Sequence, residues 1–164
     1  VPKGIRIAYR ATPGSAVAAD LVGAEGIVNA VERSNFGLAL DTGDLFTSDG
    51  GLDALDRCYL DQFFLVELCD LIRLENASIG ERHLRVPPGD GAFGDDIVEL
   101  IRRLRVIAYS GGFCISATND DYAQLPADFV VERAMASLQW LLALLRHVDL
   151  PRRTPAAGAG RPRT

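Results

Sequence analysis

Short β-rich apolar runs alternate with longer segments of helical periodicity, and this alternation occurs four times along the chain. The predicted strands are residues 5–10, 36–40, 71–75 and 113–117. Alternation of this kind implies a parallel sheet with right-handed crossover connections. Four such units make either half of an eight-stranded barrel or a small open α/β sheet, and periodicity alone does not choose between them.

The segments after these strands carry apolar residues at helical spacing. We expect helices over residues 15–31, over residues 52–66, after Asp95 and Asp96 as capping residues, and after the turn at Pro126. Two loops are expected between them, over residues 42–51 and 79–93, and the second contains Pro87, Pro88 and several glycines.

The composition indicates one globular domain over residues 1–149. Of the 164 residues 48% are hydrophobic, enough for a substantial core, and the net charge of −5 argues against a general nucleic-acid-binding protein. Residues 150–164 differ, because four arginines lie there among Pro, Ala and Gly. We predict a disordered basic tail, and a weak contact of this tail with anions or nucleic acid is the less favoured alternative.

The three cysteines indicate neither disulfides nor a zinc site. Cys58, Cys69 and Cys114 are scattered in apolar surroundings without a CxxC pair, which predicts buried thiols in a reducing cytoplasm. We find no signal peptide and no apolar run long enough for a membrane span, and we expect a cytoplasmic location. The chain begins with Val1, so we expect a processed product, a fragment or an unusual start.

The stretch from Asn35 to Asp44 is the first candidate for a functional site. Its apolar run, residues 36–40, predicts a buried strand that delivers Asp41 and Thr42 to its carboxyl end. Carboxylates at the carboxyl ends of parallel strands are where α/β folds place their chemistry.

Five segments in order resemble a known family: residues 4–10, 36–44, 81–91, 109–112, and 119–122 together with 137–141. They resemble the C-terminal half of the xylose isomerase-like TIM barrels, the sugar phosphate isomerase/epimerase superfamily, and look most like its 3-dehydroshikimate dehydratase branch. The resemblance implies a half-barrel of four βα units with parallel strands. It also implies isomerase or lyase chemistry, in which a metal polarises a small hydroxylated keto compound while a carboxylate moves a proton.

The resemblance further implies a site for Mg²⁺, Mn²⁺ or Co²⁺, with Glu, Asp, His or Gln, and Glu as ligands. Here these positions fall on Arg10, Asp41, Arg73 and Ser116, so only Asp41 is retained. Arginine has no lone pair to offer a metal. The four residues carry a formal charge of +1, against about −3 in the family's set. We therefore predict a degraded metal site in which Arg10 and Arg73 flank Asp41.

A partial rescue of this metal site is the alternative. Asp44 stands where the family has a further His, and Glu75 lies two residues beyond Arg73 on the same predicted strand. Asp41, Asp44 and Glu75 would then hold the ion together.

Basic residues supply the candidate substrate contacts. The segment with Arg82, His83 and Arg85 resembles the family's substrate-side loop, and Arg10 and Arg73 would face the same mouth. His83 is the candidate for proton transfer beside Asp41 and Glu75. A solvated basic loop is the competing interpretation.

Three other residues favour structural roles. Asn119 is expected to form an Asx turn, Trp140 to pack on the last helix, and His147 to lie near a helix end.

Two functions follow from these observations. The first is a divergent or truncated member of the superfamily that acts on a small hydroxylated keto compound. The second is a catalytically inactive α/β module, a pseudoenzyme, that binds an anionic metabolite or serves as an assembly partner. In either case the open edges of a half-barrel predict a homo-oligomer or a complementing N-terminal half-barrel.

Overall fold

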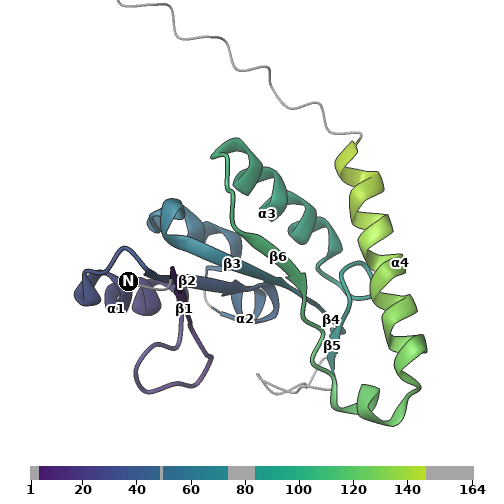
Figure 1. Cartoon of the computed structure of the whole chain (residues 1–164). Coiled ribbons are helices and arrows are strands. Elements are labelled where there is room, and N and C mark those ends of the chain that lie inside the picture. Colours follow the sequence, from purple (N-terminus) through teal and green to yellow (C-terminus); the bar gives the residue numbers. More distant parts are fainter. Residues whose placement is uncertain (1–3, 49, 74–83, 147–164) are drawn as a thin grey trace, which may run out of the picture.

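A four-stranded parallel sheet forms the centre of the protein (Figure 1). The computed structural model describes residues 4–48, 50–73 and 84–146. The sheet order is β1 (Ile7–Arg10), β2 (Phe36–Asp41), β3 (Phe63–Leu68) and β6 (Gly112–Ile115), and each neighbouring pair is parallel. This confirms the predicted α/β fold and is consistent with a partial TIM barrel. The sheet is not closed, and β1 and β6 are its end strands.

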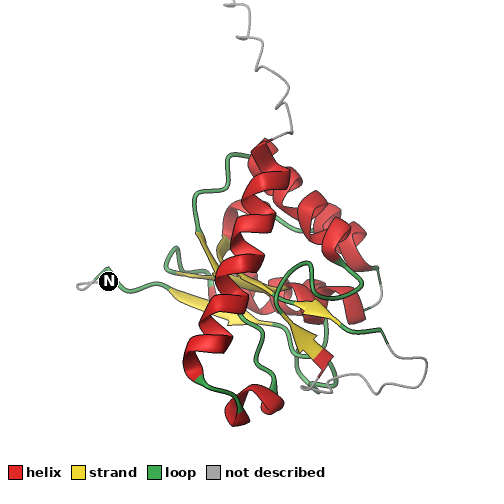
Figure 2. Ribbon diagram, turned by 90° about the vertical axis from the view of Figure 1, so that its right-hand side faces the viewer, coloured by secondary structure: helices red, strands yellow, loops and turns green. Residues whose placement is uncertain are grey.

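Helices follow the strands along the chain. They are α1 (Leu21–Val31), α2 (Thr42–Thr47), α3 (Gly94–Val106) and α4 (Ala127–Arg146), with the 3₁₀ helices η1 (Gly51–Arg57), η2 (Leu60–Gln62) and η4 (Asp120–Gln124). A small antiparallel pair, β4 (Asp70–Leu71) with β5 (Arg85–Val86), lies between β3 and α3 in the chain. Figure 1 shows α1 at one end of the sheet and α4 at the other, and in Figure 2 α4 runs along the side nearest the viewer. None of the described helices has the length and hydropathy that crossing a bilayer requires.

The core lies between one face of the sheet and the helices. Leu38 and Leu40 of β2 and Val66 and Leu68 of β3 are buried in the cluster that also includes the apolar side chains of α1 and α3. The alternate residues of β2 face the other side, because successive side chains of a strand point in opposite directions. Ala39 and Asp41 on that second side are buried as well.

The third strand lies earlier in the chain than predicted. Residues 51–57 and 60–62 form 3₁₀ helices rather than the start of a helix over residues 52–66, and β3 occupies Phe63–Leu68. The run from Phe63 to Leu68 is rich in strand-forming side chains, and its apolar positions also happened to continue a helical spacing. Of the strand predicted over residues 71–75, Leu71 belongs to β4, Ile72 and Arg73 lie in no strand, and residues 74 and 75 lie outside the described residues. The third strand of the sheet was therefore misplaced.

Several boundaries also differ from the predictions. The helix expected from residue 15 begins at Leu21, because the side chain of Asp20 caps it by accepting from Gly23 N at 2.7 Å. Asp95 and Asp96 lie in the first turn of α3, and Phe93 holds the N-cap position. The loops expected over residues 42–51 and 79–93 contain α2 and β5. The predicted tail, residues 150–164, and His147 lie outside the described residues.

Candidate functional site: an ion-pair cluster at the strand ends

Asp41 is the last residue of β2, and its local structure fixes its side chain. It is also the N-cap of α2, where its Oδ1 accepts from Asp44 N at 3.1 Å. The residue is only 2% exposed. A buried carboxylate needs cations or hydrogen-bond donors around it. The neighbouring side chains supply both.

Arg85 of β5 makes the most buried of these contacts. Its Nη2 donates to both carboxylate oxygens of Asp41, and its Nη1 donates to Asp44 Oδ1 at 3.2 Å. Gly43 makes this approach possible, because a Cβ at that position would lie 2.9 Å from Arg85 Nη1 and 2.6 Å from Cys69 Sγ. A side chain at position 43 would therefore displace the arginine.

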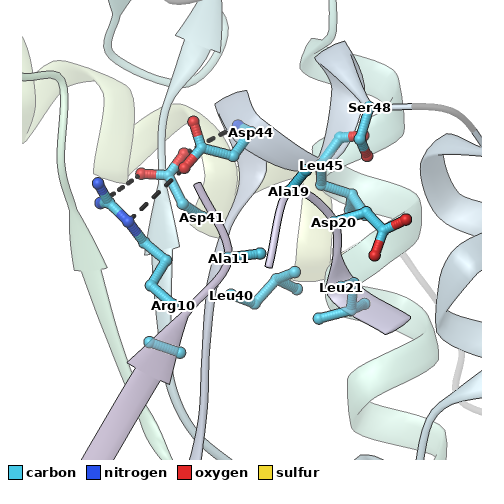
Figure 3. Close-up of a pocket in the computed structure, with 11 residues that line it drawn as sticks. Arg10, Ala11, Ala19, Asp20, Leu21, Leu40, Asp41, Asp44, Leu45 and Ser48 are labelled. Atoms are coloured by element: carbon cyan, nitrogen blue, oxygen red, sulfur yellow. Dashed lines mark hydrogen bonds and ion pairs between the residues drawn. The ribbon is translucent and has the colours of Figure 1, made fainter. Parts of the chain in front are cut away.

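Arg10, at the end of β1, lies among three carboxylates. Its Nη1 is 3.2 Å from Asp41 Oδ2 and 3.0 Å from Glu67 Oε2, and its Nε is 3.6 Å from Asp44 Oδ2. Figure 3 shows Asp41 and Asp44 beside the Arg10 guanidinium. The Arg10 side chain is 41% exposed, so one side of the cluster is open to solvent. The guanidinium thus occupies the point toward which the three acids converge.

Glu67 belongs to this site although the sequence analysis did not select it. It lies in β3 directly opposite Asp41 in the parallel pairing of the two strands. A single charged residue near the carboxyl end of the apolar run from Phe63 to Leu68 was the available signal. The error in placing the third strand concealed it.

The charges of the cluster differ from the predicted sum. Asp41, Asp44 and Glu67 with Arg10 and Arg85 give a formal charge of −1, rather than the +1 expected from the sequence. Burial, and then the charge of Asp41, raise the pKa of Asp44 above its ordinary value despite the two arginines. Asp44 Oδ2 is buried and accepts no hydrogen bond from the described residues. Asp44 is therefore the least stabilised carboxylate of the three.

The predicted residues are only partly brought together. Arg10 and Arg85 reach Asp41, but Arg73 lies over the ring of Phe93, with its Cζ 5.2 Å from the centroid. The second arginine beside Asp41 is thus Arg85, since β3 ends five residues before Arg73 and the chain has left the sheet there. Ser116 follows β6, and its backbone N donates to Leu68 O at 2.9 Å.

Three of the predicted site residues, Glu75, Arg82 and His83, lie outside the described residues, so their roles remain predictions.

The two structural predictions near the site hold. The Asn119 side chain accepts from Asp121 N at 2.9 Å in the expected Asx turn, and its Nδ2 also donates to Arg85 O at 3.0 Å. Trp140 is partly buried and packs against the core, as predicted.

Asp70 is a second buried aspartate that the sequence analysis did not identify. It is fully buried, and it accepts from Leu71 N at 2.8 Å, Phe93 N at 2.8 Å and Gly89 N at 3.0 Å. The bonds from Gly89 and Phe93 tie the segment after β5 to β4. Asp70 thereby helps to fix the strand that carries Arg85.

The divalent metal that the resemblance implies does not fit the side chains of the described residues as they lie here. Across residues 4–48, 50–73 and 84–146, no group of three or more His, Cys, Asp or Glu side chains is arranged to hold a metal ion. The physical reason is that the guanidinium of Arg10 fills the space between the acids, while Arg85 engages both oxygens of Asp41. The hollow beside the cluster measures only about 20 Å³, room for a single water molecule (Figure 3).

Comparisons with known proteins agree on the fold. Residues 1–144 match the family described as Xylose isomerase-like TIM barrel. The structure of the IOLI protein with a bound zinc atom is 25% identical over 87% of this chain and 51% of that one, with a TM-score of 0.69. A xylose isomerase domain protein from Alicyclobacillus acidocaldarius subsp. acidocaldarius is 20% identical over 89% of this chain and 53% of that one, with a TM-score of 0.66.

A fusion of a xylose isomerase-like TIM barrel with 4-hydroxyphenylpyruvate dioxygenase is 22% identical over 86% of this chain and 23% of that one, with a TM-score of 0.72. No curated protein matches the chain. The chain spans about half the length of the IOLI protein.

Proposed function

The chain belongs to the xylose isomerase-like TIM barrel family, and we propose that it is a catalytically inactive α/β module in which an ion-pair cluster has replaced the metal site. One observation carries this proposal. The guanidinium of Arg10 lies among the carboxylates of Asp41, Asp44 and Glu67, where a cation is needed to offset their charge. The protein therefore supplies that cation from its own chain.

Because the Arg10 guanidinium already offsets the charge of the acids, a divalent ion is not needed there and would bind with difficulty. With the metal absent, the five charged groups already sum to −1. A divalent ion would have to displace Arg10 and would also meet Arg85, which is only 12% exposed and has little room to withdraw. Repulsion between the metal and two guanidiniums at such distances opposes binding.

The module's role is more consistent with assembly than with binding an anionic metabolite. Both arginines are already paired with carboxylates, and the cluster keeps a negative formal charge. An anion would have to compete with three acids for the same guanidiniums. We therefore propose that the barrel fold persists as a partner in an assembly, while the strand-end cluster stabilises it.

Metal-dependent catalysis is the second candidate, and two observations favour it. The IOLI structure contains a zinc atom, and three carboxylates converge here around an arginine whose side chain is 41% exposed. In this version the protein resembles sugar phosphate isomerases/epimerases or 3-dehydroshikimate dehydratases. The acids around Arg10 would have to hold the metal, which would supply polarisation of a carbonyl in a small hydroxylated keto compound. Asp44, whose pKa is raised by burial, would exchange the proton.

Metal titration separates the two candidates. Calorimetry and thermal unfolding of the wild type with Zn²⁺, Mn²⁺, Mg²⁺ and Co²⁺ should show no binding and no stabilisation. The variant Arg10→Gln frees the three acids and should gain metal-dependent stabilisation. Arg6→Gln is the matched control, because Arg6 precedes the same strand but lies over the Phe64 ring, 4.7 Å from its centroid.

Metal-dependent turnover of a substrate would contradict the proposal that the module is catalytically inactive. Wild-type protein that binds a metal at micromolar concentration, and that converts dehydroshikimate or a ketose only when the metal is present, would establish the second candidate. The same assays on Asp41→Asn would show whether that activity depends on this cluster.

A further inference from the structure

Arg85 enters the ion-pair cluster from outside the main sheet. Its strand β5 has two residues and pairs with β4 in a separate two-stranded sheet, whereas Arg10 and Asp41 belong to the four-stranded sheet. Ile72 N donates to Leu84 O at 2.9 Å, which adds one more backbone hydrogen bond to the small pair. A pairing this short fixes its strand weakly. The position of Arg85 therefore depends on what holds the chain after β5.

The chain after β5 is held by α4. Residues 87–93, here called the connecting segment, run from β5 toward α3. In the view of Figure 1, β4 and β5 lie between β2 and α4. Ser137 Oγ of α4 donates to Pro88 O at 2.6 Å, and both residues are buried. The ring of Trp140 lies so close to Gly89 that a Cβ there would be 2.8 Å from Trp140 Cε3. The connecting segment is thus in direct contact with the helix.

The connecting segment is stiff enough to pass a displacement on to Arg85. It begins with Pro87 and Pro88, and the second of these follows Arg85 by three residues. Proline rings fix φ, so neither residue can absorb a shift by rotation about that bond. Asp70 accepts from two backbone N–H groups of the segment, which joins it to β4 as well. A shift of the connecting segment therefore moves β4, β5 and Arg85 together.

Ser137 is the polar attachment of α4 at this place. The structure describes all twenty residues of this helix, and three of them are buried, namely Ser137, Leu141 and Leu145. The two leucines make apolar contacts, which have no preferred direction. The Ser137 hydrogen bond requires its acceptor within a narrow range of distance and angle. Arg133 also pairs with Asp90 of the connecting segment, but both side chains are 37% exposed, and such pairs contribute little. Ser137 therefore sets where the connecting segment lies on the helix.

We propose that α4 controls the position of Arg85 in the ion-pair cluster, with Ser137 as the positioning residue that acts through Pro88. A shift of α4 draws the connecting segment with it and withdraws Arg85 from Asp41. The inference rests on the proposed function, because it concerns the same cluster, and it adds a path by which an event at an outer helix reaches the buried carboxylate.

A double-mutant cycle in urea denaturation of the whole chain tests this coupling. The variants are Ser137→Ala, Arg85→Ala and both together, and no hydrogen bond or ion pair among the described residues joins Ser137 directly to Arg85. Ser137→Ala should raise the equilibrium constant of unfolding by a smaller factor in the Arg85→Ala background than in the wild type. We expect the two factors to differ by about two-fold or more, since residues that share a network are non-additive.

Tyr109→Phe is the matched control for the cycle. It removes another hydroxyl-to-carbonyl hydrogen bond, from Tyr109 Oη to Gly112 O at 3.0 Å, at the amino end of β6. It should raise the unfolding constant by the same factor with and without Arg85→Ala.

Nitrogen-15 NMR of the single variants follows Arg85 directly, and it does not require the double variant to fold. The Nε–H signal of Arg85 is identified by its loss in Arg85→Ala, and burial of the side chain, which is 12% exposed, slows its exchange with solvent. Ser137→Ala should speed this exchange by about two-fold or more. Ser137→Thr, which keeps the hydroxyl, should restore the wild-type rate, and Tyr109→Phe should leave it unchanged.

Three outcomes would overturn the coupling. They are an additive cycle for Ser137 and Arg85, an unchanged Arg85 exchange rate in Ser137→Ala, and the same acceleration in Tyr109→Phe. None of these measurements uses a metal. Wild-type protein that binds a metal would therefore overturn the proposed function and leave the coupling intact, while an additive cycle in protein that binds no metal would overturn the coupling alone.

Discussion

Asp41 and Asp70 are buried aspartates near the ends of two neighbouring strands, and the protein compensates their charges differently. Asp70 accepts from three backbone N–H groups, those of Leu71, Gly89 and Phe93. Asp41 accepts from one backbone N–H and from the Cys69 thiol, with Sγ 3.9 Å from its Oδ1, and it pairs with Arg10 and Arg85. One carboxylate is compensated by the main chain and the other mainly by side chains.

We propose that this difference separates an aspartate that organises the fold, Asp70, from one that belongs to the candidate site, Asp41. Backbone donors are fixed by the path of the chain. The hydrogen bonds to Asp70 therefore do not depend on the side chains of the residues that donate them. Guanidiniums sit on long side chains that can move or be replaced. The residues around Asp41 can therefore be substituted while the fold persists. This is expected at the carboxyl end of a parallel strand, where barrel folds place their chemistry.

The largest expected effect is the loss of the Asp70 anchor. Asp70→Ala leaves three backbone N–H groups without their acceptor in a buried site, and we expect the free energy of unfolding to fall by about 3–5 kcal/mol. Urea denaturation measures this change. Asp95→Ala, an exposed residue in the first turn of α3, is the control and should cost less than about 1 kcal/mol. A loss below that value at Asp70 would remove the distinction between the two aspartates.

The next effect is the removal of one arginine from Asp41. Arg85→Ala leaves the buried carboxylate of Asp41 without its main partner. We expect the free energy of unfolding to fall by about 3 kcal/mol in the same denaturation experiment. Arg10→Gln should cost only about 1 kcal/mol, because the Arg10 side chain is half-exposed and its contacts are screened by solvent. The reverse order would show that Arg10 is the principal counter-charge.

A smaller effect is expected from Asp44, and it depends on pH. Because burial and then Asp41 raise its pKa in the folded state, its favourable contribution is complete below the ordinary value of 3.8 and is lost as the pH rises through the raised pKa. Asp44→Asn should therefore gain stability relative to the wild type between pH 3.8 and 7, by less than about 1 kcal/mol. Thermal unfolding across that range measures the difference. Asp41→Asn should instead lose stability at neutral pH, because its arginines lose their partner.

The smallest effect concerns the reactivity of a cysteine thiol rather than the free energy of unfolding. Cys69 lies between the two aspartates in the chain, and burial, followed by the charge of Asp41, raises its pKa to about 12. Its thiol should resist iodoacetamide at pH 8 in the folded protein, because the thiolate is the reacting species. Cys114 is exposed and should be alkylated first, as mass spectrometry of the peptides would show. Rapid labelling of Cys69 would mean that the region between the aspartates opens readily.

Parts of the site could be read from the sequence because they depend on local pattern. The apolar run before Asp41, followed by residues that begin a helix, placed this carboxylate at a strand end, and Arg10 likewise ends a predicted strand. Arg85 was assigned only to a substrate loop. Its position beside Asp41 depends on the pairing of β5 with β4 and on the absence of a side chain at Gly43. Neither feature has a local signature.

The sequence by itself determined the class of fold and the location of Asp41, because periodicity and apolar runs report which residues must be buried. Only the tertiary structure decided that β3 begins at Phe63 and that Glu67 lies opposite Asp41. The register of β2 with β3 includes a shift between Leu38 and Ala39, and such a shift is set by packing between strands distant in the chain. For this reason the acids around Arg10, and the charge of the site, were settled by the fold rather than by the motif.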